Sequence, residues 1–237
     1  MRPQNRTAEQ VIAEIASDAH GVVTRMWLLG AGITIAEIKQ RLRTGALLRE
    51  HPGVYRVGHR APILEASYLA AVVACGEGAA LIGAAAGHLL GLLSGPAPAP
   101  TVLTLTERRV PGIATRRTRL IHPAEVTTWR GIPVTTVART LVDLAALLSR
   151  EDLARACHEA GVRHSTTPAA VETVLARRPN SPGTAKLRAI LRGEVRVTLS
   201  KLERRFLARL REAGLPIPVT NRPAGGRRVD RRWPSTG

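Results

Sequence analysis

The sequence predicts an α+β fold that begins with a winged helix-turn-helix. Residues 5–60 show three helical segments followed by a strand–turn–strand pattern. Residues 61–193 mix apolar helical stretches with alternating, strand-like ones, and residues 198–237 hold one helical segment and two short strands. A length of 237 residues suits two or three small domains. The last part is too small to bury much surface, so we expect an incomplete domain there.

Capping residues mark the three helices expected in residues 5–60. Thr7 with Gln10, and Thr34 with Glu37, have the spacing of capping boxes. Thr24 is in position to cap a helix of its own. These signals predict a first helix from Thr7 to about His20, a short second helix over Arg25–Leu29, and a third over Ile35–Arg43 that ends at Gly45.

The hydrophobic period changes after the third helix. Leu47–Arg49 and Val54–Val57 alternate like strands, and Glu50–Gly53 between them carries the Pro and Gly of a turn. Three helices followed by such a hairpin are the element order of a winged helix-turn-helix, in which the hairpin is the wing.

The middle part, residues 61–193, is expected to be a mixed α/β domain. Its apolar run Tyr68–Leu93 predicts a buried pair of helices, because the longest uncharged piece, Gly78–Gly87, is far shorter than the roughly 20 residues of a membrane span. A strand over Thr101–Thr106, a possible partner over Gly112–Arg119 and a hairpin over Val126–Thr136 follow. The remaining pattern predicts helices over Val137–Leu148, Glu151–Ala160, Pro168–Arg177 and Thr184–Arg192, with Asp143 as a surface or capping carboxylate.

The charge balance favours a polyanionic partner. Lys and Arg number 35 against 18 Asp and Glu, a net charge of +17, and cations that neutralise phosphates release counterions. The alternative is that an Arg-, Ala- and Gly-rich composition reflects a GC-rich genome.

Two distant cysteines, Cys75 and Cys157, match no metal or redox spacing, which indicates a reduced protein of the cytoplasm.

The third helix carries the candidate DNA-reading side chains. Ile35, Ile38 and Leu42 are expected to face the first two helices. The opposite side presents Gln40 and Arg43, which suit adenine and guanine edges. Cations at its flanks and on the hairpin are expected to meet phosphates, although each is individually as compatible with an ordinary solvated charge: Lys39, Arg41, Arg49 and Arg56.

The tail carries two carboxylates with a different potential role. Glu203 on a helix and Asp230 on a strand are the residue types that share a divalent cation such as Mg²⁺ in phosphodiester cleavage. A working site needs a further carboxylate and a Lys or His, and no acidic residue follows Asp230. The simpler interpretation is that Glu203 is a helix-surface charge beside Arg204 and Arg205.

Several of these segments resemble a known family. The stretches Gly21–Arg25 and Gly53–His59 resemble the winged helix-turn-helix of AbiEi-type antitoxins, and Gly131–Thr136 with Ala138–Leu144 is similar to their middle domain. The tail, through Leu202–Leu207, Val229–Asp230 and Trp233–Pro234, resembles the start of a very-short-patch-repair-like endonuclease domain whose second half is absent, and Arg231 stands where that pattern has an aromatic residue.

The resemblance implies a DNA-binding regulator like the antitoxin of a type IV toxin–antitoxin system, which represses its own operon. It implies double-stranded DNA and a cognate toxin as partners, with no membrane and no cofactor. The alternative is an endonuclease of the very-short-patch-repair-like class that is inactive or depends on a partner, and only that alternative calls for a divalent metal. A third possibility is an interaction protein whose basic faces bind a toxin. The sequence leaves enzymatic activity and oligomeric state open.

Overall fold

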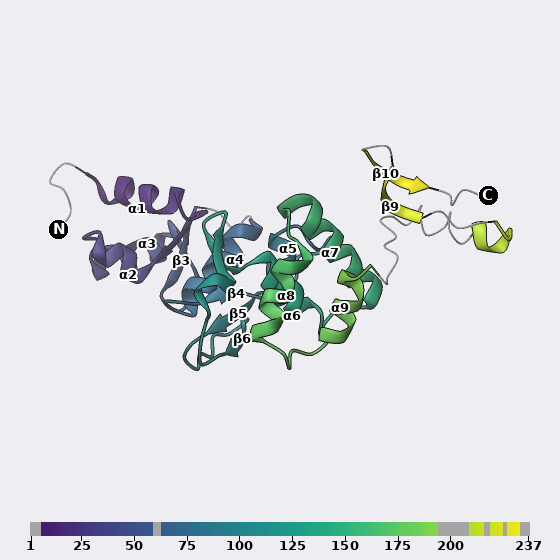
Figure 1. The fold of residues 1–237 in the computed structure, drawn as a ribbon. Coiled ribbons are helices and arrows are strands. Elements are labelled where there is room, and N and C mark those ends of the chain that lie inside the picture. The colour runs from purple at the N-terminus through teal and green to yellow at the C-terminus, as the bar shows by residue number, and fades with distance from the viewer. Residues whose placement is uncertain (1–5, 59–62, 194–208, 216–218, 225–226, 233–237) are drawn as a thin grey trace.

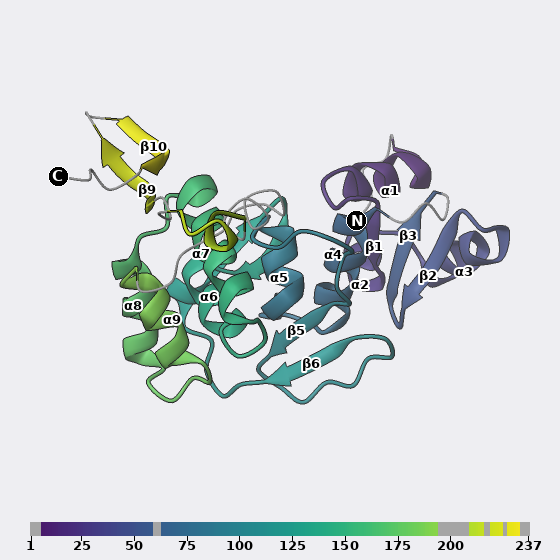
Figure 2. The same ribbon diagram turned by 90° about the vertical axis from the view of Figure 1, so that its right-hand side faces the viewer.

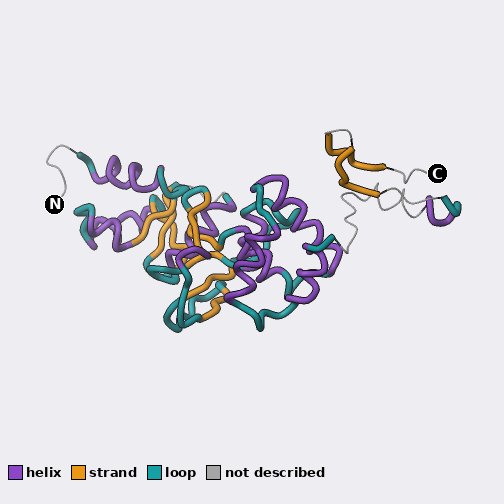
Figure 3. Tube along the Cα trace, viewed as in Figure 1, coloured by secondary structure: helices purple, strands orange, loops and turns teal. Residues whose placement is uncertain are grey.

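The computed structural model has an α+β fold, as predicted, and describes residues 6–58, 63–193, 209–215, 219–224 and 227–232. We call residues 6–58 the N-terminal module and residues 63–193 the middle body (Figures 1 and 3). None of the helices in these ranges is long and apolar enough to cross a lipid bilayer.

The N-terminal module has the predicted order of elements and one extra strand. Its helices are α1 (Ala8–Ser17), α2 (Arg25–Gly30) and α3 (Ile35–Thr44), and its strands are β1 (Val22–Thr24), β2 (Leu47–His51) and β3 (Val54–Val57). The sequence pattern did not predict β1, which pairs antiparallel with β3 and gives a sheet of order β1-β3-β2. Both predicted capping boxes are present, at Thr7 and at Thr34.

The middle body is built on a mixed five-stranded sheet. In the order β6-β5-β4-β8-β7, its strands are β6 (Ala114–Arg117), β5 (Thr101–Thr104), β4 (Ala80–Leu81), β8 (Ile132–Thr135) and β7 (Val126–Trp129). Strands β5 and β6 pair in parallel, as do β4 and β8, and the other pairs are antiparallel. The predicted hairpin around Arg130 and Gly131 is confirmed as β7–β8.

The helices of the middle body pack beside this sheet and against one another. They are α4 (Leu64–Ala74), α5 (Gly83–Leu89), α6 (Val137–Leu144), α7 (Arg150–His164), α8 (Pro168–Arg177) and α9 (Thr184–Leu191), with the short 3-10 turn η1 (Pro123–Glu125) before β7. The prediction of two helices over Tyr68–Leu93 is incomplete, because β4 lies between α4 and α5 at the centre of the sheet. In the tail, residues 209–212 are helical, and β9 (Val219–Ala224) pairs with β10 (Arg227–Arg232).

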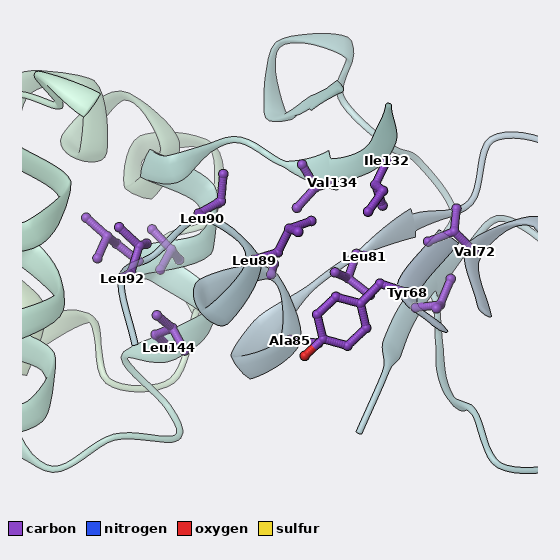
Figure 4. Packing of buried hydrophobic residues seen from close by; sticks show 14 of the residues in the cluster. Tyr68, Val72, Leu81, Ala85, Leu89, Leu90, Leu92, Ile132, Val134 and Leu144 are labelled. Carbon is purple, nitrogen blue, oxygen red and sulfur yellow. The ribbon is translucent and has the colours of Figure 1, made fainter. Parts of the chain in front are cut away.

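Two hydrophobic cores hold the fold. The smaller one lies inside the N-terminal module and includes Val11, Leu28 and Ile38. The larger one fills the middle body, where residues from β4, β8, α5 and α6 pack together (Figure 4). Tyr68 is fully buried in it, and its hydroxyl donates a hydrogen bond to the carbonyl of Pro98 at 2.9 Å. Burial raises the pKa of Tyr68 to about 12, so the side chain stays protonated in its apolar site.

The N-terminal module and the middle body share a packed boundary (Figure 2). Ala19, Val22 and Val54 of the module belong to the larger core of the body. His20 contributes a ring nitrogen 2.6 Å from the carbonyl oxygen of Arg130, in the β7–β8 turn. The guanidinium of Arg130 in turn donates to Glu65 of α4 at 2.7 Å. These contacts fix the direction in which α3 and the hairpin β2–β3 point from the body.

Candidate nucleic-acid interface

Helix α3 is held firmly at both ends. The backbone N–H of Thr34 donates to Glu37 Oε2 at 2.8 Å, and the N–H of Glu37 donates to Thr34 Oγ1 at 3.2 Å. Gly45 ends the helix in the left-handed conformation, with φ of 78°. Ile38 is buried in the core of the module. A capped and anchored helix presents its outer side chains in a fixed geometry.

We expect the Thr34→Ala variant to lose about 1 kcal/mol of unfolding free energy, because the first turn of α3 loses its capping oxygen. Urea denaturation followed by circular dichroism measures the change. Thr44→Ala, at the opposite end of α3, is the control, because Thr44 only back-bonds to the Arg41 carbonyl at 3.3 Å. A loss in Thr34→Ala no larger than in this control would contradict the capping role.

One face of α3 is exposed over two helical turns. Ala36, Lys39, Gln40 and Arg43 are all exposed and follow the i, i+3, i+4, i+7 spacing of a single face. Arg43 Nη2 donates to Gln40 Oε1 at 2.5 Å, so the amide and the guanidinium lie side by side. Lys39, predicted at the flank, lies on this face. We call Lys39, Gln40 and Arg43 the α3 face.

Arg41 is placed differently from its predicted role at the exposed flank. Its Nη2 contacts Glu9 Oε1 of α1 at 2.5 Å, and its Nη1 donates to the carbonyl of Glu37 at 3.0 Å. Only 15% of its side chain is exposed. Arg41 therefore ties α3 to α1. The prediction that Ile35 faces the first two helices is also wrong, since Ile35 is 46% exposed at the first turn of α3.

The two arginines of the β2–β3 hairpin lie in unlike surroundings. Arg49 on β2 is exposed, with its guanidinium carbon 6.0 Å from the ring centre of Tyr55. Arg56 on β3 pairs with Glu50 at 2.8 Å, and only 13% of its side chain is exposed. Arg49 therefore extends the basic surface of the α3 face onto the hairpin, whereas the charge of Arg56 is already balanced within the hairpin.

A buried ionic cluster in the middle body was missed by the sequence analysis. Arg139 on α6 lies between two carboxylates: its Nη1 is 2.6 Å from Glu125 Oε2, and its Nε is 3.2 Å from both oxygens of Asp143. Glu125 is 1% exposed and also accepts from Arg178 Nε at 2.8 Å. The prediction of Asp143 as a surface or capping carboxylate is wrong, because its side chain is only 9% exposed and lies in this cluster.

The two carboxylates of the cluster titrate in opposite directions. Burial works to raise the pKa of Glu125, but hydrogen bonds from Arg139 and Arg178 hold that pKa below its usual value. Burial dominates at Asp143 and raises its pKa despite the attraction of Arg139. The ion pairs and hydrogen bonds of this cluster link η1, α6 and the end of α8, which is a structural role.

The structure tests the nuclease interpretation only in part. Glu203 lies outside the described residues, and Asp230 lies on β10. Within the described ranges, no group of three or more His, Cys, Asp or Glu side chains is arranged to hold a metal ion. The endonuclease alternative therefore remains a prediction from the sequence.

A second basic segment is exposed and was not singled out from the sequence. Arginines occupy five of the twelve positions from 108 to 119, in and around β6. The signal that would have found it is local arginine density. The net charge of the whole chain does not carry that signal.

Comparisons with known proteins leave the family open. No protein-family model matches the chain, and no curated protein matches it. Among solved structures, the crystal structure of the RV2827C protein from Mycobacterium tuberculosis is similar at 20% sequence identity and a TM-score of 0.47, over 78% of this chain and 80% of that one. The resemblance to AbiEi-type antitoxins stays a prediction, and a function has to be inferred from the residues of this chain.

Proposed function

We propose that the chain is a DNA-binding transcription regulator of the antitoxin kind, which represses its own operon and restrains a cognate toxin in the cytoplasm. The α3 face carries this proposal: Lys39, Gln40 and Arg43 are exposed together on a helix fixed by caps and by Arg41. An α-helix fits the major groove, where a Gln reads adenine and an Arg reads guanine. Arg49 is in position to contact the adjacent backbone.

The charge and the thiols are consistent with this proposal. A net charge of +17 attracts a polyanion over a long range. Cys75 and Cys157 are both free thiols, as expected in a reducing compartment.

The test is binding of the full chain to duplex DNA from upstream of its own gene, with a scrambled duplex of equal length beside it. We expect preference for the upstream duplex. Changing Gln40 or Arg43 to Ala removes a bidentate base contact, and each such contact contributes about 1–3 kcal/mol of discrimination. The ratio of the two affinities therefore falls by about 5-fold to 150-fold in each variant.

Lys39→Ala separates base reading from phosphate binding. A phosphate contact carries no sequence information, so this variant weakens both duplexes alike and leaves the affinity ratio unchanged. Arg150→Ala on α7, in the middle body, is the matched control for loss of one exposed charge. An unchanged affinity ratio after removal of both Gln40 and Arg43 would show that α3 does not read DNA.

A further inference from the structure

The five arginines of the second basic segment form one exposed group. Arg108, Arg109, Arg116, Arg117 and Arg119, which we call the arginine strip, are all exposed to solvent. Arg109 contacts Glu107 at 3.3 Å, but both side chains are largely solvated, so that pair contributes little. Among the residues that the structure describes, the guanidinium groups of Arg117 and Arg119 have neither a hydrogen bond nor an ion pair.

The strip lies along an open edge of the sheet. Strand β6 pairs in parallel with β5 and stands at the end of the five-stranded sheet of the middle body. The N–H of Thr118 continues this pairing by donating to the carbonyl of Thr104 at 2.9 Å. The chain is therefore extended from Ala114 to Thr118, so successive side chains alternate between the two faces, and Arg117 and Arg119 share one face while Arg116 lies on the other. Arg116 to Arg119 cover roughly 10 Å at the rise of a strand.

The strip begins beside the wing of the N-terminal module. The guanidinium of Arg108 lies against Gly76, where a Cβ would come within 3.2 Å of Nη2. Gly76 lines one groove together with Pro52 and Gly53 at the tip of the hairpin β2–β3. Figure 2 shows the connection between β5 and β6 extending toward that hairpin. Arg108, at the start of the strip, therefore lies close to the tip of the β2–β3 hairpin.

We propose that the arginine strip is a second DNA contact surface, which binds backbone phosphates of the duplex flanking the segment read by α3. The inference rests on the proposed function. Exposed arginines, of which Arg117 and Arg119 have no acidic partner among the described residues, are suited to the closely spaced charge of a duplex, which carries one negative charge per roughly 1.7 Å of axis. Contact with phosphates adds affinity and orientation but no preference for particular bases. The α3 face then supplies specificity, and the strip lengthens the footprint on the wing side.

The experiment measures the salt dependence of duplex binding by the full chain. The triple variant Arg109→Ala/Arg117→Ala/Arg119→Ala removes three charges of the strip and spares Arg108 beside Gly76 and Arg116 near Asp143. The control Arg150→Ala/Arg163→Ala/Arg192→Ala removes three exposed charges from the helical side of the body. Each phosphate contact contributes about 0.9 to the slope of log K against log salt concentration.

We expect the strip variant to lower the magnitude of that slope by about 2–3, on both upstream and scrambled duplexes. The ratio of its affinities for the two duplexes stays at the wild-type value. The stretch of DNA that the protein protects from hydroxyl radicals becomes shorter on one side of the site. Equal slopes in the strip and control variants would overturn the assignment. Loss of binding to a polyglutamate peptide in the strip variant, with DNA binding intact, would overturn it in favour of an acidic protein partner.

The outcomes separate this inference from the proposed function. A wild-type chain that shows no preference for the upstream duplex contradicts the regulator, while the slope on scrambled DNA still tests the strip. A wild-type chain that binds no duplex at any salt concentration contradicts both.

Discussion

Replacing Arg139 with Met is expected to destabilise the protein by about 3–5 kcal/mol, because it leaves two buried carboxylates without their shared cation. Met keeps an unbranched apolar stem and removes the charged guanidinium with its donors. Glu125 keeps Arg178 at 2.8 Å, whereas Asp143 loses the partner that contacts both of its oxygens. Urea denaturation gives the change in unfolding free energy.

Arg177→Met is the matched control for this effect. Arg177 approaches the same carboxylate, at 3.7 Å from Glu125 Oε1, but 35% of its side chain is exposed. Its loss should cost less than about 1 kcal/mol, as for a solvent-screened pair. If the two variants are equally stable, the cluster does not depend on a buried charge balance.

The pH dependence of the Arg139→Met variant gives an independent check. In the wild type the lowered pKa of Glu125 stabilises the fold above its ordinary pKa, and this contribution is lost as pH falls through the folded value. The raised pKa of Asp143 has the opposite effect on stability. As the pH falls, the folded protein takes up a proton at Asp143 more readily than the unfolded chain does, and the fold regains stability. Without Arg139 both carboxylates take up protons more readily. The deficit of the variant relative to wild type should therefore be largest at neutral pH and shrink toward pH 4.

Much of the fold was predictable from short-range sequence signals. The capping pairs at Thr7 and Thr34, and the glycine at position 45, act through backbone groups within a few residues, so the start of α1 and both ends of α3 were predictable, whereas α1 ends at Ser17, before the predicted His20. The β7–β8 hairpin was equally readable from its turn at Arg130 and Gly131. Each of these elements is decided mainly by its own sequence.

Strand β4 could not be found in the same way. Ala80 and Leu81 lie in an apolar run with no alternation, because both faces of a central strand are covered. A buried strand of two residues and a buried helix have the same composition there. Only pairing with β5 on one side and β8 on the other distinguishes them, and those partners are distant in sequence.

The outer face of helix α3 was predictable from the sequence, but the ion pairs of Arg41 and Asp143 were not. Helical geometry alone placed Gln40 and Arg43 on the outer face of α3. The partners of Arg41 and Asp143 depend on which elements pack together: Glu9 comes from another helix, and Glu125 lies on the far side of a hairpin from Arg139. Hydrophobic periodicity contains no information on such contacts between charged groups.

The Gly183→Ala variant should lose about 2–5 kcal/mol of unfolding free energy, from two additive causes. Gly183 precedes α9 with φ of +82°, a conformation that costs an L-residue about 1–2 kcal/mol. A Cβ at this position would also come within 2.2 Å of the carbonyl oxygen of Ala145, which is backbone and cannot rotate away. Moving the Ala145 carbonyl would disturb the end of α6, which carries the buried ionic cluster.

Gly45→Ala separates the two causes. Gly45 has nearly the same backbone angle, with φ of +78°, but its Cβ would meet nothing within 4 Å. This control should therefore lose only the conformational part, about 1–2 kcal/mol. Thermal or urea unfolding of both variants measures the difference, which is the free energy of the close approach between α9 and α6. Equal losses would mean that the backbone relaxes around position 183, and that the contact with Ala145 is not tight in solution.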